Sequence, residues 1–319
     1  MLRMILQRLM LGFVTVGLVS LIIFSAVEIL PGDACTALLK QDAQGQQLAQ
    51  CRTELGLERP ALIRYAVWAS GALKGDLGVS AHGSKRISEL VSDRVKNSLL
   101  LGVTALAIGI PLAFTMGILA ALKRDKLLDL FLSSLAISAM TIPEFVSATI
   151  LILVFSGWLQ WLPGIVLTSA DAPVSEFFPG IILPVVVLAM VMTAHILRTV
   201  RSSVIEVLDS EYVRMATLKG VHYRRIILRH VLPNALLPVI NVVALTVGWL
   251  LGGVVVIETV FNFPGLGRLM VNAISDRDLA LVQGIALIVA SVYVVVNLAA
   301  DLLTMLANPR LRSAMVKRI

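Results

Sequence analysis

Six long apolar runs constrain what this chain can fold into. They extend over about residues 9–30, 98–122, 127–158, 177–200, 236–260 and 284–306. A helix of about 20 apolar residues is long enough to cross the hydrocarbon core of a membrane. Of the 319 residues, 58% are hydrophobic and only 15% are charged, whereas a soluble globular chain has about 25% charged residues. The sequence therefore predicts an all-α membrane protein with six transmembrane helices.

The charges beside these runs predict how the helices are oriented. Basic residues lie near the N-terminus, in the loop 123–126 and in the tail after residue 306, whereas the loop 157–178 contains no Lys or Arg. Because short cytoplasmic loops carry an excess of Lys and Arg, both termini are expected in the cytoplasm. The first run is too long for the apolar part of a cleaved signal peptide, so residues 1–31 are expected to remain as an N-terminal transmembrane helix. These loops also explain the net charge of +7, and no nucleic-acid partner is indicated.

Residues 32–97 form a long polar segment that is expected to be an external, periplasmic loop region between the first two helices. It contains both cysteines of the chain, Cys35 and Cys51. An even pair in one external loop is typical of a disulfide in an oxidising compartment, where closing about 15 residues contributes roughly 3 kcal/mol. Two free thiols, or half of a metal site that includes His82, are the alternatives. Gly75 and Gly78 predict turns in the same segment.

The second most informative segment is the basic loop 201–233, between the fourth and fifth runs. Asp209 and Ser210 are available to cap a short helix that starts at Glu211, and Gly220 has the position of a C′ glycine with positive φ. One face of this helix contains Tyr212, Met215, Ala216 and Lys219. A helix this short is unstable alone in water, so it is expected to pack against another surface. The excess of basic over acidic residues places the loop in the cytoplasm.

These residues also have the spacing of a known motif. Glu211, Ala216, Gly220 and Leu232-Pro233 resemble the EAA loop of ABC importer permeases. The strings YVRMATLKG and RHVLPNALLP resemble the first-subunit type of the peptide/nickel (dipeptide–oligopeptide) permeases, as do Pro31-Gly32-Asp33, ELGLERP at 54–60, GDLGVS at 75–80 and ETVFNFPGLG at 258–267. The chain departs from the family pattern at Leu279-Ala280 and at Asn308. An ordinary basic loop between two membrane helices is the alternative.

The resemblance implies a type I ABC importer permease fold, with residues 98–319 as a five-helix core. It implies that the loop forms a coupling helix that contacts a separate ATPase subunit through Glu211, Tyr212, Met215, Ala216, Gly220, His230, Leu232 and Pro233. The implied partners are a second homologous permease, two cytoplasmic ATPase subunits, a periplasmic or lipid-anchored substrate-binding protein and the lipid of a bacterial inner membrane. ATP and Mg would bind to the ATPase subunits, and this chain would need no cofactor. Relatives carry peptides, nickel chelates, glutathione or opines, with transport by alternating access.

Several common catalytic motifs are absent from the sequence. It has no GxxxxGK[ST], HExxH, CxxC or GxSxG string, and its four histidines are scattered, so neither an enzyme nor a metal site is predicted. The energy for transport must then come from another chain or from an ion gradient. An ion-coupled secondary transporter or channel, with Glu144, His195 and Asp301 as a proton relay, is therefore the alternative function.

Some features inside the apolar runs leave two interpretations open. Glu144 is a candidate for the translocation pathway, or it pairs with a neighbouring helix. His195 and Asp301 are expected near the cytoplasmic ends of their helices, where their side chains can reach water. The prolines Pro111, Pro143 and Pro184 either bend their helices or affect only local packing. The pair Gly248 and Gly252 permits a close helix contact, either within this chain or with a second permease.

Overall fold

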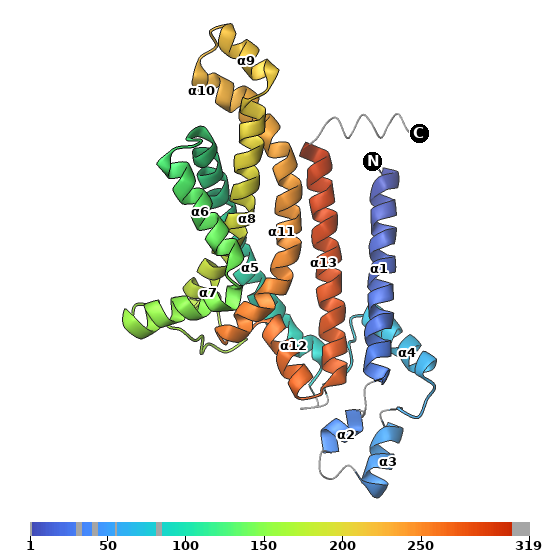
Figure 1. The fold of residues 1–319 in the computed structure, drawn as a ribbon. Coiled ribbons are helices and arrows are strands. Elements are labelled where there is room, and N and C mark those ends of the chain that lie inside the picture. The colour runs from blue at the N-terminus through green and yellow to red at the C-terminus, as the bar shows by residue number, and fades with distance from the viewer. Residues whose placement is uncertain (1, 30–33, 40–43, 55, 81–84, 308–319) are drawn as a thin grey trace. The chain divides into compact units, whose positions relative to one another are not determined.

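The computed structural model describes residues 2–29, 34–39, 44–54, 56–80 and 85–307, which are mostly helical (Figure 1). In these ranges no strand occurs, apart from an isolated antiparallel bridge between Val79 and Arg86. The longer helices are α1 (Leu2–Ile29), α5 (Ile87–Leu122), α8 (Ile182–Leu208), α11 (Leu232–Val260) and α13 (Leu279–Ala307). The shorter helices are α2 (Ala34–Leu39), α3 (Gly45–Glu54), α4 (Ala61–Leu73), α6 (Leu127–Thr141), α7 (Glu144–Leu151), α9 (Glu211–Leu218), α10 (Tyr223–Ile226) and α12 (Leu266–Ser275). Short helical segments η2 (Ile152–Trp158), η3 (Val174–Phe177) and η4 (Ile227–Val231) lie between them, and the predicted all-α class is confirmed.

Four of the helices are long and apolar enough to cross a membrane unaided, namely α1, α5, α8 and α13. The number rises to six when each of two bent pairs is taken as one span. One pair is α6 with α7 and η2, bent by 107°, and the other is Tyr223–Leu236 with Pro238–Leu250, bent by 48°. The predicted runs therefore lie mainly on helices where the structure describes them, but the third is bent in its middle and the fifth begins at the second bend.

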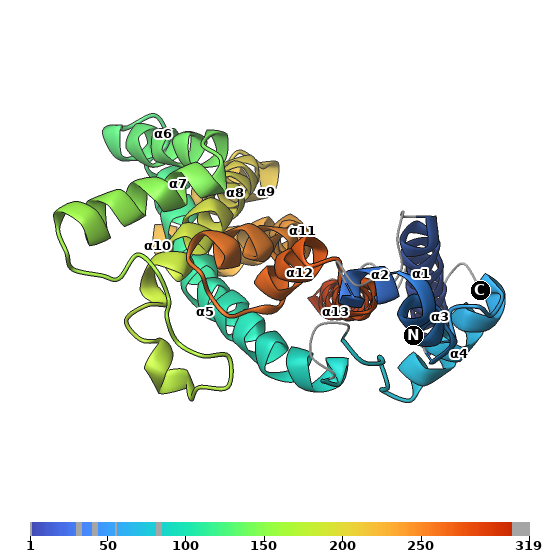
Figure 2. The same cartoon turned by 90° about the horizontal axis from the view of Figure 1, so that it is seen from below.

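The sharp bend in the third run has a local cause at Pro143. Proline disfavours the helical conformation of the residue before it, and Ile142 is extended, with φ −79° and ψ 124°. Pro143 then occupies the N-cap position of α7. Figure 1 shows α7 running across the direction of α6, and Figure 2, seen from below, shows it extending away from α8 and α11. Of the two interpretations left open for Pro143, the structure therefore has the bend.

One compact unit of the chain comprises Met1–Leu99, Leu167–Glu176 and Asn262–Val295. Its core is a cluster of buried apolar side chains from α5, α12, α13 and the segment before α5: Leu77, Ile87, Val91, Leu266, Leu269, Ala273, Leu281 and Ile285. Ile87 and Val91 are one helical turn apart, and Val95 packs against the same cluster. Helix α5 therefore starts at Ile87 and not near Ser98 as predicted, because an amphipathic stretch precedes its apolar run.

Hydrogen bonds to buried polar side chains fix the segments between the helices of this unit. The Ser80 hydroxyl lies 2.5 Å from a carboxylate oxygen of the buried Asp278. The Asn97 side-chain amide donates to the carbonyls of Ala170, at 2.9 Å, and Pro264, at 3.0 Å. The segments around residues 80, 170 and 264 are thereby held to the start of α5 and to α13.

The same unit holds α4 against α1 and joins α2 to α3. Glu28 forms an ion pair with Arg64 of α4. The Tyr65 hydroxyl lies 2.8 Å from that of Ser20. The sulfur atoms of Cys35 in α2 and Cys51 in α3 are joined, 2.08 Å apart. His82 and the string Pro31-Gly32-Asp33 lie outside the described residues.

The second compact unit comprises Leu100–Val166, Phe177–Phe261 and Val296–Ile319, and α8 is its central helix. Helix α8 packs against α6 and α11 and is buried along most of its apolar part. Helix α5 approaches it closely at Gly117, where a Cβ atom would lie 2.8 Å from Val200. Because α8 extends to Leu208, His195 lies at its midpoint. The expectation that His195 lies near a helix end is therefore wrong.

Candidate functional site: helix α9 and a pocket between α6, α8 and α11

Helix α9 forms where the sequence predicted it, and its end has a Schellman motif. The N–H of Gly220 donates to the carbonyl of Thr217 at 3.0 Å, and the N–H of Val221 donates to that of Ala216 at 3.2 Å. This pair of bonds requires a left-handed residue at C′, and Gly220 has a φ of 71°. The predicted positive φ is thus confirmed. Ser210 is the N-cap residue, as predicted, but its hydroxyl donates to the carbonyl of Val207 at 2.5 Å and makes no capping bond to α9.

The face of α9 that the sequence singled out is open to solvent in this chain. Tyr212 is 46% exposed and Met215 is 52% exposed, while Ala216 is half-buried and Lys219 is exposed. Only Val213, on another side of the helix, is buried. Figure 1 shows α9 and α10 beyond the end of α8. The helix therefore presents an amphipathic face that nothing in the described part of the chain covers.

The remaining predicted coupling residues lie close by in the chain. His230 is in η4 and is exposed, and Leu232 and Pro233 form the first turn of α11. The Tyr212 hydroxyl donates to the carbonyl of His230, at 3.4 Å. This bond brings α9 together with the segment that leads into α11. Glu211 forms a surface ion pair with Arg214 at 3.3 Å.

Two further ion pairs, which the sequence analysis missed, join the segment 124–129 to α8 and to Asp209. The guanidinium of Arg201 binds both carboxylate oxygens of the buried Asp129, at 2.5 and 2.7 Å. The backbone N–H of Asp125 donates to the same carboxylate at 2.9 Å. Arg124 pairs with Asp209, immediately before α9, at 2.9 Å. The sequence did contain a signal for the first pair, because Asp129 lies at the start of an apolar run and a buried acid requires a partner.

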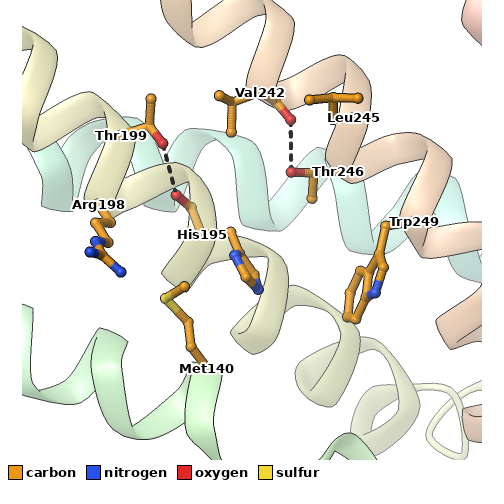
Figure 3. A pocket seen from close by; sticks show the side chains of 8 residues that line it. All are labelled: Met140, His195, Arg198, Thr199, Val242, Leu245, Thr246 and Trp249. Carbon is orange, nitrogen blue, oxygen red and sulfur yellow. Dashed lines mark hydrogen bonds between the residues drawn. The ribbon is translucent and has the colours of Figure 1, made fainter.

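A pocket of about 430 Å³ lies between α6, α8 and α11 (Figure 3). Helix α8 contributes His195, Arg198 and Thr199 to its lining, and α11 contributes Thr246 and Trp249. Figure 3 shows the His195 ring between Arg198 and Trp249, and the centroids of the His195 and Trp249 rings are 6.0 Å apart. Met140, Val242 and Leu245 supply the apolar part of the lining. The structure thus gives His195 a place in a pocket, which the sequence did not predict.

Glu144, the predicted pathway residue, lies in the first turn of α7 against α11. Its Oε2 atom is buried and has no hydrogen-bond partner in the described part of the chain. A Cβ atom at Gly253 would lie 2.7 Å from this oxygen, so the glycine leaves the space that the carboxylate occupies. By contrast, no described atom lies within 4 Å of a Cβ at Gly252. The close contact on α11 is therefore made at Gly253, and of the two contacts left open for Gly252 the one within this chain is not present among the described residues.

The proton relay proposed as an alternative has no support as a cluster. His195 and Glu144 lie on different helices of the second unit, and no hydrogen bond joins them among the described residues. The side chain of Asp301 and the tail from Asn308 onward lie outside the described positions. Within the described residues, no group of three His, Cys, Asp or Glu side chains is placed to hold a metal ion.

Comparison with known families identifies two matches that together cover nearly the whole chain. Residues 109–313 match the family described as binding-protein-dependent transport system inner membrane component. Residues 1–95 match the N-terminal domain of binding-protein-dependent transport system membrane components.

Several curated proteins are similar over almost their full length. A putative peptide permease protein of Brucella suis is 34% identical, covering 98% of this chain and 99% of that protein. A probable peptide ABC transporter permease protein of Sinorhizobium fredii is 34% identical, covering 97% and 98%. A glutathione transport system permease protein of Escherichia coli is 33% identical, covering 98% and 99%.

A solved structure shares the fold. The crystal structure of an amino acid ABC transporter with histidines superposes with a TM-score of 0.50, covering 70% of this chain and 94% of that chain at 18% identity. The likeness at this identity concerns the fold alone, and it agrees with the predicted type I permease fold.

Proposed function

We propose that this chain, which belongs to the family of binding-protein-dependent transport system inner membrane components and is the permease subunit of an ABC importer, is driven through helix α9. In this proposal separate ATPase subunits dock on the exposed face of α9, and their closure moves the helix as a lever. The permease then switches between inward-facing and outward-facing states by rigid-body motion. The observation that carries the proposal is the exposed, amphipathic α9, which directly follows Asp209 and its ion pair with Arg124.

The chemistry of the exposed face supports a protein partner. An isolated helix of eight residues is unstable in water, yet α9 leaves Tyr212 and Met215 exposed. Aromatic and methionine side chains are enriched at protein interfaces. The contacts would be made by Glu211, Tyr212, Met215 and Ala216, with Gly220 fixing the end of the helix and His230, Leu232 and Pro233 supporting it.

The remaining parts of the assembly are inferred from the family. We expect a second homologous permease, two ATPase subunits that bind ATP and Mg, and a periplasmic or lipid-anchored substrate-binding protein. The cargo would be small peptides or related solutes, because the similar proteins carry the names of peptide and glutathione permeases. Glu144 remains a candidate for the translocation pathway, since its carboxylate is buried without a partner among the described residues.

We place the chain in a bacterial inner membrane with α9 and both termini in the cytoplasm. The joined cysteines Cys35 and Cys51 then face the oxidising periplasm. Single-cysteine labelling from outside intact cells should modify a probe at the exposed position Asp171 and miss one at His222. The reverse labelling pattern would place α9 on the wrong side for an ATPase.

Substitution of Met215 by Glu tests the docking face directly. Met215 is half exposed and glutamate is a good helix former, so the folded chain should be unaffected. A partner that covers the position would instead have to desolvate a charge. The assembled importer containing Met215→Glu should lose ATP-driven uptake and bind its ATPase subunits more weakly. Arg214→Gln, about 100° away around the helix by its α-helical geometry, serves as the matched control and should retain both.

Two results would contradict the proposal. Normal uptake by the Met215→Glu importer would show that this face is not the docking site. Transport by the purified chain without any ATPase subunit would favour the ion-coupled alternative.

A further inference from the structure

We propose that the pocket beside His195 binds the anionic group of a ligand, a carboxylate or a phosphate, through Arg198 and His195. This inference rests on the proposed transport function, because it assigns a binding site within the same unit that α9 would move. The pocket volume of about 430 Å³ lies within the range of small-molecule sites. It is large enough for a ligand of about the size of a dipeptide.

The charge of the lining favours an anion. Among the described residues that line the pocket, none is acidic, while Arg198 and His195 both lie on the wall formed by α8. Neither side chain has a hydrogen bond or an ion pair to another described residue. By contrast, Arg201, one turn further along α8, is already bound by Asp129. The guanidinium of Arg198 is therefore available to bind a carboxylate or phosphate with two parallel hydrogen bonds.

The two threonines in the pocket do not compete for this role. The Thr199 hydroxyl donates to the carbonyl of His195 at 3.3 Å, and the Thr246 hydroxyl donates to that of Val242 at 2.8 Å (Figure 3). Their hydrogens are thus used within their own helices. Among the described side chains that line the pocket, only those of Arg198, His195 and Trp249 retain an N–H for a ligand.

The rest of the lining determines what can be attached to the anion. Trp249, Leu245, Val242 and Met140 surround the pocket with aromatic and apolar surface. Figure 3 shows Trp249 on the opposite side of His195 from Arg198. A ligand with an anionic end and an apolar end fits this arrangement. Both a short peptide with a free C-terminal carboxylate and a phospholipid headgroup with its acyl chain have such a structure.

The experiment uses the assembled importer, purified without nucleotide, and three probes. Leucyl-leucine and its C-terminal amide differ only in the carboxylate, and phosphatidylglycerol that copurifies with the complex is quantified by mass spectrometry. Loss of a charge-assisted hydrogen bond weakens binding by roughly 10- to 100-fold. We therefore expect Arg198→Gln to weaken the binding of leucyl-leucine about tenfold or more, to the affinity of the amide. Arg198→Lys, which keeps the charge and checks folding, should retain part of the affinity.

Arg224→Gln is the matched control, because Arg224 is an exposed arginine of α10 that does not line the pocket. It should leave all three measurements unchanged. If Arg198→Gln instead lowers only the amount of copurified phosphatidylglycerol, the anion is a lipid phosphate and not a cargo carboxylate. If Arg198→Gln changes neither the binding of leucyl-leucine nor the lipid content, the proposal is wrong.

Failure of this inference and failure of the proposed function give different results. Binding to the pocket is measured without ATP, so it does not depend on coupling through α9. A wild-type complex that binds leucyl-leucine but shows no ATP-driven uptake of any solute would contradict the transport function alone. A complex with normal ATP-driven uptake, in which Arg198→Gln alters neither leucyl-leucine binding nor lipid content, would contradict the pocket alone.

Discussion

Replacing Gly220 tests whether a left-handed backbone at the end of α9 is needed for coupling. Its φ of 71° is a conformation that costs an L-residue with a Cβ atom about 1–2 kcal/mol. No described atom lies within 4 Å of a Cβ at this position. The cost of a substitution in this chain is therefore a backbone cost and not a steric one. A penalty of this size lowers the population of the correctly closed loop by a factor of about 5 to 30.

The size of the effect should depend on the residue introduced. Asparagine tolerates the left-handed region, alanine less so, and β-branched valine least. We expect ATP-driven uptake and cargo-stimulated ATPase activity of the reconstituted importer to fall together. Gly220→Asn should retain the most activity, Gly220→Ala less and Gly220→Val the least. The Gly220→Val importer should lose most of its activity while the purified chain keeps its thermal stability.

Gly45 offers a matched control for the same backbone cost at a distant place. It has a φ of 60° and no described atom within 4 Å of a Cβ, but it lies at the start of α3. Gly45→Val should therefore leave coupling intact. Equal activity of the Gly220→Val and wild-type importers would refute the argument from backbone conformation. Equal loss in Gly220→Asn and Gly220→Val would show that a partner fills the space beside Gly220.

Two further predictions concern the ion pairs of Asp129 and Asp209 and the disulfide between α2 and α3. Asp129→Asn should lower the free energy of unfolding by about 2 kcal/mol, because it leaves the partly exposed Arg201 without its buried carboxylate. The control Arg124→Ala, at the exposed pair with Asp209, should lower it by under about 1 kcal/mol. Thermal denaturation in detergent measures both effects, and equal melting temperatures for the two variants would contradict the assignment. Alkylation of the unreduced protein should label neither Cys35 nor Cys51, whereas two labelled cysteines in an intact-mass measurement would show free thiols.

The part of the candidate site that sequence predicted best is the part whose structure is local. Glu211 begins α9 and Gly220 takes a positive φ, as the sequence indicated. A C′ glycine acts through hydrogen bonds within a few residues of itself, so its role is visible in a short stretch of sequence. The N-cap was predicted less well. The Ser210 hydroxyl can accept a hydrogen bond from a backbone N–H in the first turn of α9 or donate one to the carbonyl of Val207, and sequence does not decide between these two bonds.

The effect of each proline was not predictable for a different reason. Pro111 lies inside a continuous α5, Pro143 marks a bend of 107°, and Pro238 lies at a bend of 48°. Proline always removes one backbone hydrogen bond, but packing against neighbouring helices can offset that loss. The same residue therefore has three outcomes that depend on tertiary contacts. The Asp129–Arg201 pair escaped prediction likewise, since its members are 72 residues apart in sequence.

The structure links the docking face of α9 to the pocket through two helices. Only Asp209 and Ser210 separate α9 from α8, and the bond from Tyr212 to the carbonyl of His230 ties α9 to the segment before α11. Arg198 lies about 15 Å along α8 from its end, at 1.5 Å per residue. Close-packed helices move as rigid elements, so they do not absorb a displacement of α9. On the proposed mechanism, a movement of α9 therefore changes the spacing of the helices that line the pocket. Because such coupling is reciprocal, a ligand that binds one arrangement tenfold more tightly would shift the docking equilibrium by about 1.4 kcal/mol. This would allow cargo in the pocket to influence ATP hydrolysis on a separate chain.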